Sequence, residues 1–178
     1  MNQIDRYITL LKEYNVTTNI FSKQSYDKLT FHINDCITLS KLITNKKLVL
    51  FDFGSGSGLP SIPIAIMNPK NTIYAIESKS RKTNFLNIAK DTLNLTNLNI
   101  ITQNLFEWKA PCKPNIITAK AFAPLDKINR LYNKFKGKST FVLIPISKTQ
   151  ASVYEKDNSI SIIEVNSFYY AKLFTNNT

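Results

Sequence analysis

The pattern of apolar positions along the chain changes near residue 46. Before it, apolar side chains recur at steps of three and four residues, which predicts amphipathic helices over residues 2–13 and about 25–44. After it, short apolar runs predict buried strands, at residues 48–53, 71–77, 98–102, 115–118 and 140–144. Helical patterns separate these runs, at residues 58–67, 80–93 and 124–135. The first of these helices could begin near residue 61, because Pro63 lies deeper than its first turn. Residues 160–165 and 167–174 have the pattern of a closing antiparallel pair of strands.

Strands that alternate with helices are typical of the α/β class, in which a parallel sheet has helices on both faces. We therefore expect one domain over residues 1–178, made of an N-terminal helical cap (1–45) and a Rossmann-like core (46–178). Such sheets bind ligands beyond the carboxyl ends of their strands, where the strand order reverses. The segment that follows the first predicted strand is therefore the first place to search for chemistry.

The charge of the chain points to a polyanionic partner. Lys and Arg number 23 and Asp and Glu 12, a formal net charge of +11, which suits binding to RNA. Mutational bias is a second explanation for part of the lysine count, because the chain is rich in Asn, Ile and Lys, as proteins from AT-rich genomes are.

The cysteines and the apolar runs indicate whether the protein binds metal and where in the cell it is expected. Cys36 and Cys112 form no metal-binding spacing, so we expect no metal site and reduced thiols. No run of about 20 apolar residues occurs, which argues against a membrane span. The opening residues lack the apolar core of a signal peptide, so we expect a cytoplasmic protein.

The stretch FDFGSGSGLP, residues 51–60, holds three of the four glycines of the chain. Glycine allows a positive φ and lets a ligand approach the backbone, and a helix that starts after such a loop presents free amides. Dinucleotide enzymes use G-x-G-x-x-G, whereas the spacing here is G-x-G-x-G at Gly54, Gly56 and Gly58. No G-K-[S/T] follows, which excludes a P-loop.

Acidic residues at two strand ends favour S-adenosylmethionine as the ligand. Asp52 completes D-x-G-x-G-x-G, the usual first motif of class I S-adenosylmethionine methyltransferases. Glu77 ends the next predicted strand, where a carboxylate can accept hydrogen bonds from both ribose hydroxyls. This order of acidic residues and glycines predicts a cofactor site rather than a tight turn without a ligand.

Several stretches of the chain resemble one family of these enzymes. FDFGSGSGLPSIPIAI, IESKSRKTNFL and ITAKAFAPL are similar to segments of the glucose-inhibited division protein B family, the small-subunit ribosomal RNA guanine-N7 methyltransferases G. The opening segments YNVTTNI and HINDCITL also resemble that family's N-terminal pattern, so the resemblance covers about residues 5–150. It implies a Rossmann-like fold with a mostly parallel seven-stranded sheet and S-adenosylmethionine as cofactor. It also implies methyl transfer to N7 of one guanine in the 530-loop of bacterial 16S rRNA, in the small ribosomal subunit.

The motif and the resemblance together imply which residues bind ligands. The cofactor-binding set lies in the glycine loop and at the ends of the second, third and fourth strands: Asp52, Gly54, Ser55, Gly56, Gly58, Leu59, Glu77, Leu105, Phe106 and Lys120. Leu105 and Phe106 fall where the family lines the adenine pocket. The expected RNA contacts are Lys79, Arg81, Lys82 and Lys148.

Three positions depart from the family pattern. Lys120 puts a point charge where Arg, with its planar fork, is usual, and Phe106 stands where an acidic residue is usual. At the end of the fifth strand, Pro145–Ser147 replace Lys-Gly, and Lys148 is the nearest lysine. These departures keep open a second interpretation, a degenerate methyltransferase fold that binds RNA or assists ribosome assembly without catalysis.

The implied chemistry needs little from the protein beyond alignment. Guanine N7 is a ring acceptor that carries no proton, so methylation there requires no general base. We therefore assign no catalytic residue, which fits a chain with one histidine and no Ser/His/Asp or Cys/His arrangement. His32 and Asp35, one helical turn apart, could lie at the catalytic mouth or hold the cap to the sheet. Trp108 is assigned to packing rather than to base stacking.

Two rival enzyme classes fit the sequence less well. A dinucleotide oxidoreductase would carry G-x-G-x-x-G and a catalytic acid or base. A methyltransferase for an exocyclic amine would carry an NPPY-like motif where this chain reads TAKAFAP. We expect a monomer that binds no membrane.

Overall fold

The centre of the protein is a sheet that places the ends of its parallel strands at one edge. The computed structural model describes residues 2–22 and 25–173. The sheet has seven strands in the order β3-β2-β1-β4-β5-β7-β6, and β7 is antiparallel to both of its neighbours. The strands are β1 (Val49–Phe53), β2 (Thr72–Glu77), β3 (Leu98–Thr102), β4 (Ile116–Thr118), β5 (Phe141–Ile146), β6 (Ile160–Val165) and β7 (Phe168–Leu173). The predicted mostly parallel sheet with a closing antiparallel pair is confirmed, although Phe174, the last residue predicted for that pair, lies outside the described residues.

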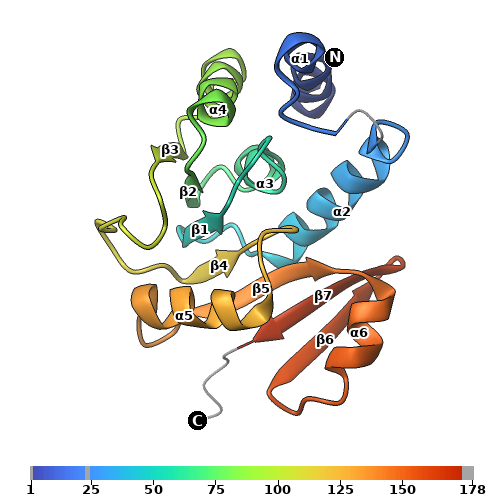
Figure 1. The fold of residues 1–178 in the computed structure, drawn as a ribbon, viewed down its shortest axis with the longest axis vertical. Coiled ribbons are helices and arrows are strands. Elements are labelled where there is room, and N and C mark those ends of the chain that lie inside the picture. The colour runs from blue at the N-terminus through green and yellow to red at the C-terminus, as the bar shows by residue number, and fades with distance from the viewer. Residues whose placement is uncertain (1, 23–24, 174–178) are drawn as a thin grey trace.

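Helices cover both faces of this sheet (Figure 1). The helices are α1 (Gln3–Thr18), α2 (Leu29–Leu42), α3 (Ser61–Met67), α4 (Ser80–Thr92), α5 (Leu125–Phe135) and α6 (Lys148–Tyr154). Leu50 packs with α2, α3 and α4 on one face, whereas Phe51 and Phe53 pack with α5 on the other. Because side chains alternate along β1, Asp52 lies on the same face of the sheet as Leu50.

None of the helices in the described part of the chain is long and apolar enough to cross a membrane.

The N-terminal helices differ in length from their prediction. α1 runs on to Thr18 instead of ending at residue 13, and α2 covers 29–42 rather than 25–44. The Asn15 side chain explains the longer α1, because it donates to the carbonyl oxygen of Phe21 (2.7 Å) and accepts from the Phe21 amide (2.9 Å). These contacts close the connection between the two helices with a buried polar side chain, which the apolar pattern does not reveal.

The corner after β5 contains a helix that the apolar pattern did not predict. β5 extends through Pro145 and Ile146, where a proline is tolerated because β4 has already ended and only β7 is paired there. Ser147 then caps α6: its hydroxyl accepts from the Gln150 amide (3.1 Å), and the Gln150 side chain accepts from the Ser147 amide (2.9 Å). This reciprocal capping box was readable as S-x-x-Q in the sequence. The departure from the family pattern at Pro145–Ser147 is thus a well-formed strand end and helix start.

Trp108 is a packing residue, as predicted. It is 4% exposed, and its ring lies 4.8 Å from Phe51 and 5.3 Å from Phe135, measured between centroids. These contacts join the segment after β3 to the α5 face of the sheet.

Replacing this side chain should cost stability. We expect Trp108→Ala to lower the free energy of unfolding by about 3–5 kcal/mol, the range for removing a large buried aromatic, in urea unfolding followed by circular dichroism. Trp108→Phe should lose less, and Val153→Ala, at a side chain 60% exposed, is the control with no expected loss. Unchanged unfolding of Trp108→Ala together with impaired RNA binding would favour base stacking instead.

Candidate functional site: a glycine loop beside a cavity

The glycine loop after β1 is held to the end of the neighbouring strand β2. The amides of Gly54 and Ser55 both donate to the carbonyl oxygen of Ile76, at 2.9 and 3.1 Å. The Gly56 amide donates to Oε2 of Glu77 at 3.1 Å. The predicted loop and the predicted acidic strand end therefore meet in one place.

Positive φ angles explain why this loop needs glycine. Gly54, Gly56 and Gly58 have φ of 70°, 56° and 96°, which costs other residues roughly 1–2 kcal/mol. A Cβ on Gly54 would lie 2.2 Å from the Phe122 ring, and one on Gly58 would lie 2.4 Å from Ile62. A Cβ on Gly56 would meet nothing closer than 3.7 Å. Gly56 is thus the point of the loop where a ligand can approach the backbone.

Glu77 has the position and chemistry expected of a ribose-binding carboxylate. It is 7% exposed at the end of β2, and its Oε1 accepts from the Lys79 amide at 3.0 Å. A carboxylate has about four acceptor positions, so capacity remains for ligand hydroxyls. Lys82 reaches over the same place, with its Nζ 3.8 Å from Oε2 of Glu77. Lys82, predicted as an RNA contact together with the exposed Lys79 and Arg81, therefore faces the glycine loop.

Asp52 lies beneath the loop rather than on its surface. It is fully buried, and neither carboxylate oxygen has a hydrogen-bond partner among the described residues. Burial raises the pKa of Asp52 to about 7, although the nearby Ser55 and Ser61 groups lower it in part. Asp52 thus lies beneath the loop with no exposed surface, and its contact with the cofactor stays a prediction.

The remaining predicted cofactor residues occupy different environments. Leu59 and Leu105 are core residues that expose only 8% and 6% of their surface to a ligand. Phe106 is 50% exposed, as a ring that stacks on adenine must be. Lys127 lies over both the Phe106 ring (5.7 Å) and the Phe122 ring (5.2 Å). The Phe106 loop and the segment after β4 therefore lie close together.

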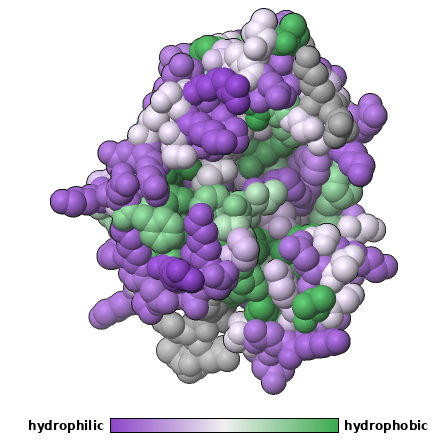
Figure 2. All heavy atoms as spheres, in the orientation of Figure 1, coloured by the Kyte–Doolittle hydropathy of each residue, from purple (hydrophilic) through white to green (hydrophobic). Residues whose placement is uncertain are grey.

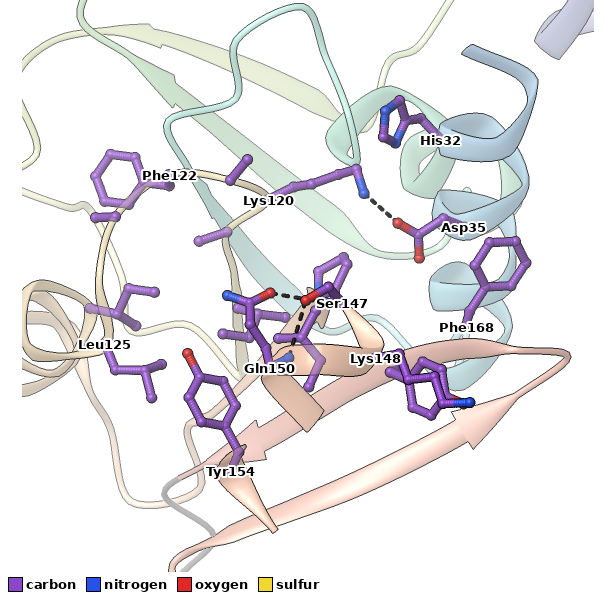
Figure 3. A pocket seen from close by; sticks show the side chains of 18 of the residues that line it. His32, Asp35, Lys120, Phe122, Leu125, Ser147, Lys148, Gln150, Tyr154 and Phe168 are labelled. Atoms are coloured by element: carbon purple, nitrogen blue, oxygen red, sulfur yellow. Dashed lines mark hydrogen bonds and ion pairs between the residues drawn. The ribbon is translucent and has the colours of Figure 1, made fainter. Parts of the chain in front are cut away.

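A cavity of about 1040 Å³ opens beside this loop, beyond the carboxyl ends of β4 and β5 (Figure 3). Its walls come from α2, the segment 119–125, the β5 corner, α6 and the β6–β7 turn. The surface around it is mostly hydrophilic, with apolar atoms showing in the central hollow (Figure 2). Phe122 lines this cavity and also packs on Gly54, so it forms the wall between cavity and loop. We did not single out Phe122 from the sequence, and its only signal there was its place in AKAFAPL.

A buried ion pair joins the cap to the strand end inside the cavity. Lys120 pairs with Asp35, and their side chains are only 15% and 7% exposed. The Tyr170 hydroxyl donates to the Asp35 carbonyl oxygen at 2.9 Å. His32 lies one turn away, and burial together with the Lys120 charge lowers its pKa. His32 and Asp35 both line the cavity, and Asp35 also ties the cap to the core.

No metal site accompanies this arrangement in the part of the chain described. No three His, Cys, Asp or Glu side chains come close enough there to hold an ion. The residues present instead fit S-adenosylmethionine, since the backbone is open to a ligand at Gly56 and the Glu77 carboxylate lies beside it.

Comparison with known proteins identifies the family. The model of the GidB family, described as rRNA small subunit methyltransferase G, matches residues 1–176. The chain belongs to the GidB family. The predicted resemblance is thereby confirmed, and with it S-adenosylmethionine as the methyl donor.

Relatives of this GidB chain match most of its length. A ribosomal RNA small subunit methyltransferase G from Brachyspira hyodysenteriae is 35% identical over 140 residues, 78% of this chain and 67% of the relative. One from Mesomycoplasma hyopneumoniae is 32% identical, over 96% of this chain and 88% of the relative.

Solved structures of other methyltransferases share the fold. A methyltransferase from Geobacter sulfurreducens has a TM-score of 0.67 at 9% identity. The match covers 96% of this chain and 89% of the Geobacter chain. A ribosomal protein L11 methylase from Lactobacillus delbrueckii has a TM-score of 0.63 at 16% identity, over 81% and 78%. The class I methyltransferase fold is therefore confirmed.

A methyl group on Gly56 should block the cofactor without unfolding the protein. We expect Gly56→Ala to weaken binding of S-adenosylhomocysteine about tenfold or more, measured by calorimetry, because the new Cβ occupies the open side of the loop. The left-handed φ should cost only about 1–2 kcal/mol of stability. Gly137→Ala, far from the loop, is the matched control with unchanged affinity. Wild-type affinity in Gly56→Ala would contradict the assignment of Gly56 to the cofactor.

Asp52 should make stability depend on pH. Its folded pKa of about 7 exceeds the ordinary 3.8, so the folded state holds the proton more tightly, and stability falls as pH rises from about 4 to 7. Above about pH 7 the loss is complete and constant. Asp52→Asn should therefore gain stability relative to wild type across this window, by a few kcal/mol, in urea unfolding at a series of pH values. Parallel pH profiles of variant and wild type would show that the buried carboxyl does not titrate in this way.

Proposed function

We propose that this enzyme transfers a methyl group from S-adenosylmethionine to N7 of a guanine in the 530-loop of 16S rRNA. The observation that carries the proposal is the cavity that shares Phe122 as a wall with the glycine loop. A base in this cavity lies directly beside the place where the cofactor is held. The names of the relatives, ribosomal RNA small subunit methyltransferase G, support RNA of the small subunit as substrate.

The side chains in the cavity suit an acceptor atom that carries no proton. When bound, the cofactor supplies a methyl group on a sulfonium cation, and a ring nitrogen lone pair can attack it without a base. The one histidine of the chain, His32, has a lowered pKa, and its Nδ1 is buried without a hydrogen-bond partner among the described residues. The Asp35 carboxylate is already paired with Lys120. The work of the protein is therefore to bind and align the reacting groups.

Lys120 can help to orient a guanine. Its ammonium has three donors, of which Asp35 takes one. The Hoogsteen edge of guanine presents O6 next to N7, so an ammonium that donates to O6 would leave N7 free. Lys120 remains a predicted cofactor residue as well, because it stands at the end of β4 between the two sites.

Basic residues around the sites suit a phosphate backbone. Lys79 and Arg81 are exposed beside the cofactor loop, and Lys148 is exposed on the rim of the cavity. We propose these three as RNA contacts and place Lys82 at the cofactor loop instead. We further propose that the enzyme acts as a monomer in the cytoplasm.

The β5 corner was the main support for a non-enzymatic RNA-binding protein. That corner is a regular strand end followed by a capped helix, and it places Lys148 on the rim of the cavity. The regular structure of this corner supports the enzyme over the non-enzymatic alternative.

Labelled methyl transfer tests the proposal. We expect label from S-adenosylmethionine to enter small ribosomal subunits that lack the modification and to map to 7-methylguanine in the 530-loop. Gly56→Ala, which should bind the cofactor poorly, is the negative control. No label, or label at another atom, from a protein that still binds S-adenosylhomocysteine would refute it.

A further inference from the structure

The cavity beside the glycine loop is larger than one base requires. Its volume of about 1040 Å³ lies at the top of the roughly 300–1,000 Å³ range of pockets for drug-sized ligands, and a purine base is smaller than such ligands. With the target guanine beside Phe122 and Lys120, the part of the cavity next to α2 and β7 remains free for a neighbouring group.

Phe31 lies at the edge of this free part. Its side chain is 54% exposed, although phenylalanine is among the residues most often buried. Among the large apolar side chains exposed in the described part of the chain, Phe31 is the one that lines this cavity. Val16 and Ile88, which are exposed on α1 and α4, do not line it. Packing in the hydrophobic core does not account for a phenylalanine at this position, because Phe31 is exposed on α2 and belongs to neither core cluster.

Neighbouring rings hold Phe31 in a fixed setting. The Phe31 and Phe168 ring centroids are 5.1 Å apart at an interplanar angle of 48°. The His32 ring meets Phe31 edge-on at 5.7 Å. Phe168 begins β7 directly after Asn166 and Ser167, whose φ values of 51° and 64° form a tight hairpin turn. Two elements far apart in sequence, α2 and the β6–β7 hairpin, therefore build one aromatic surface before any ligand arrives.

The charges around this aromatic surface suit a nucleic-acid strand. Lys148 lies on the rim of the cavity near Phe168 (Figure 3), and the exposed Lys28 immediately precedes α2. The lining holds two acidic side chains: Asp35 pairs with Lys120, and Glu164 accepts from the Tyr169 hydroxyl at 2.9 Å. Lys120 therefore compensates the Asp35 charge, and Lys28 and Lys148 outnumber the remaining carboxylate, Glu164.

We propose that Phe31 and Phe168 form a stacking platform for the base of an unpaired nucleotide adjacent to the target guanine. The proposal rests on the function proposed above and adds a second nucleotide position to the site. Every base has a π-face, so the platform fixes the position of the strand without reading its sequence. The net charge of +11 and the flanking lysines favour an RNA strand over an apolar segment of a protein partner.

A fluorescent base tests the platform directly. The probe is an RNA hairpin of the 530-loop that carries 2-aminopurine in turn at each position flanking the target guanine, because stacking quenches this base. The wild type and Phe31→Trp should quench one of these positions, and Phe31→Ala should not. Phe31→Ala should also bind the RNA about 5- to 150-fold more weakly, which corresponds to roughly 1–3 kcal/mol per stacked base. Val16→Ala, at a side chain 69% exposed on α1, is the matched control with no change in either readout.

The outcomes separate this proposal from the proposed function. Fluorescence quenching does not need methyl transfer, so the labelled-methyl experiment decides the function independently. Equal quenching and equal affinity for wild type and Phe31→Ala would overturn the platform. Wild-type RNA binding by Phe31→Ala, with weaker binding to whole small subunits, would overturn it too and would assign Phe31 to a ribosomal protein. Unchanged thermal unfolding of Phe31→Ala confirms that the variant is folded.

Discussion

The attachment of the glycine loop to β2 is the interaction on which the site depends. The chain leaves β1 and must turn at once into α3, and it does so while two loop amides share the Ile76 carbonyl oxygen and a third binds Glu77. This turn requires left-handed backbone angles, which glycine adopts without strain. Because the loop is tied to β2 on one side and packs against Phe122 on the other, the open side of Gly56 and the Glu77 carboxylate keep one relative position. The proposed cofactor site is therefore fixed by backbone geometry more than by side chains.

The cap completes the second half of the site. α2 carries Asp35 to Lys120 at the end of β4, and Tyr170 of β7 reaches the Asp35 backbone. Charges as buried as these are tolerated only when they are paired and hydrogen-bonded. These two contacts thus fix α2 at a distance from the β5 corner, and the cavity is the space left between them. A surface helix of the cap thereby becomes a wall of the proposed substrate cavity.

The two halves of the site meet at the segment after β4. Ala121 adopts a φ of 50°, a left-handed angle that is unusual for alanine, and strained residues of this kind cluster at functional sites. This angle lies between Lys120, which pairs with the cap, and Phe122, which packs on the glycine loop. One short segment therefore joins the glycine loop to the cavity.

Local patterns in the sequence determined the strands, the glycine loop, the acidic strand ends and the family. Each of these depends on residues close together in the chain, where apolar periodicity, glycine spacing and a motif can be read directly. The capping box at Ser147 and Gln150 was also local, although the apolar pattern alone missed it. Only the tertiary structure decided that Lys120 meets Asp35, that Phe122 packs on Gly54 and that Phe31 lies beside Phe168. These pairs are separated by up to 137 residues, from Phe31 to Phe168, and side chains so far apart come together only through the packing of the elements that carry them. Sequence periodicity shows which face of an element is buried, but it does not show what that face meets.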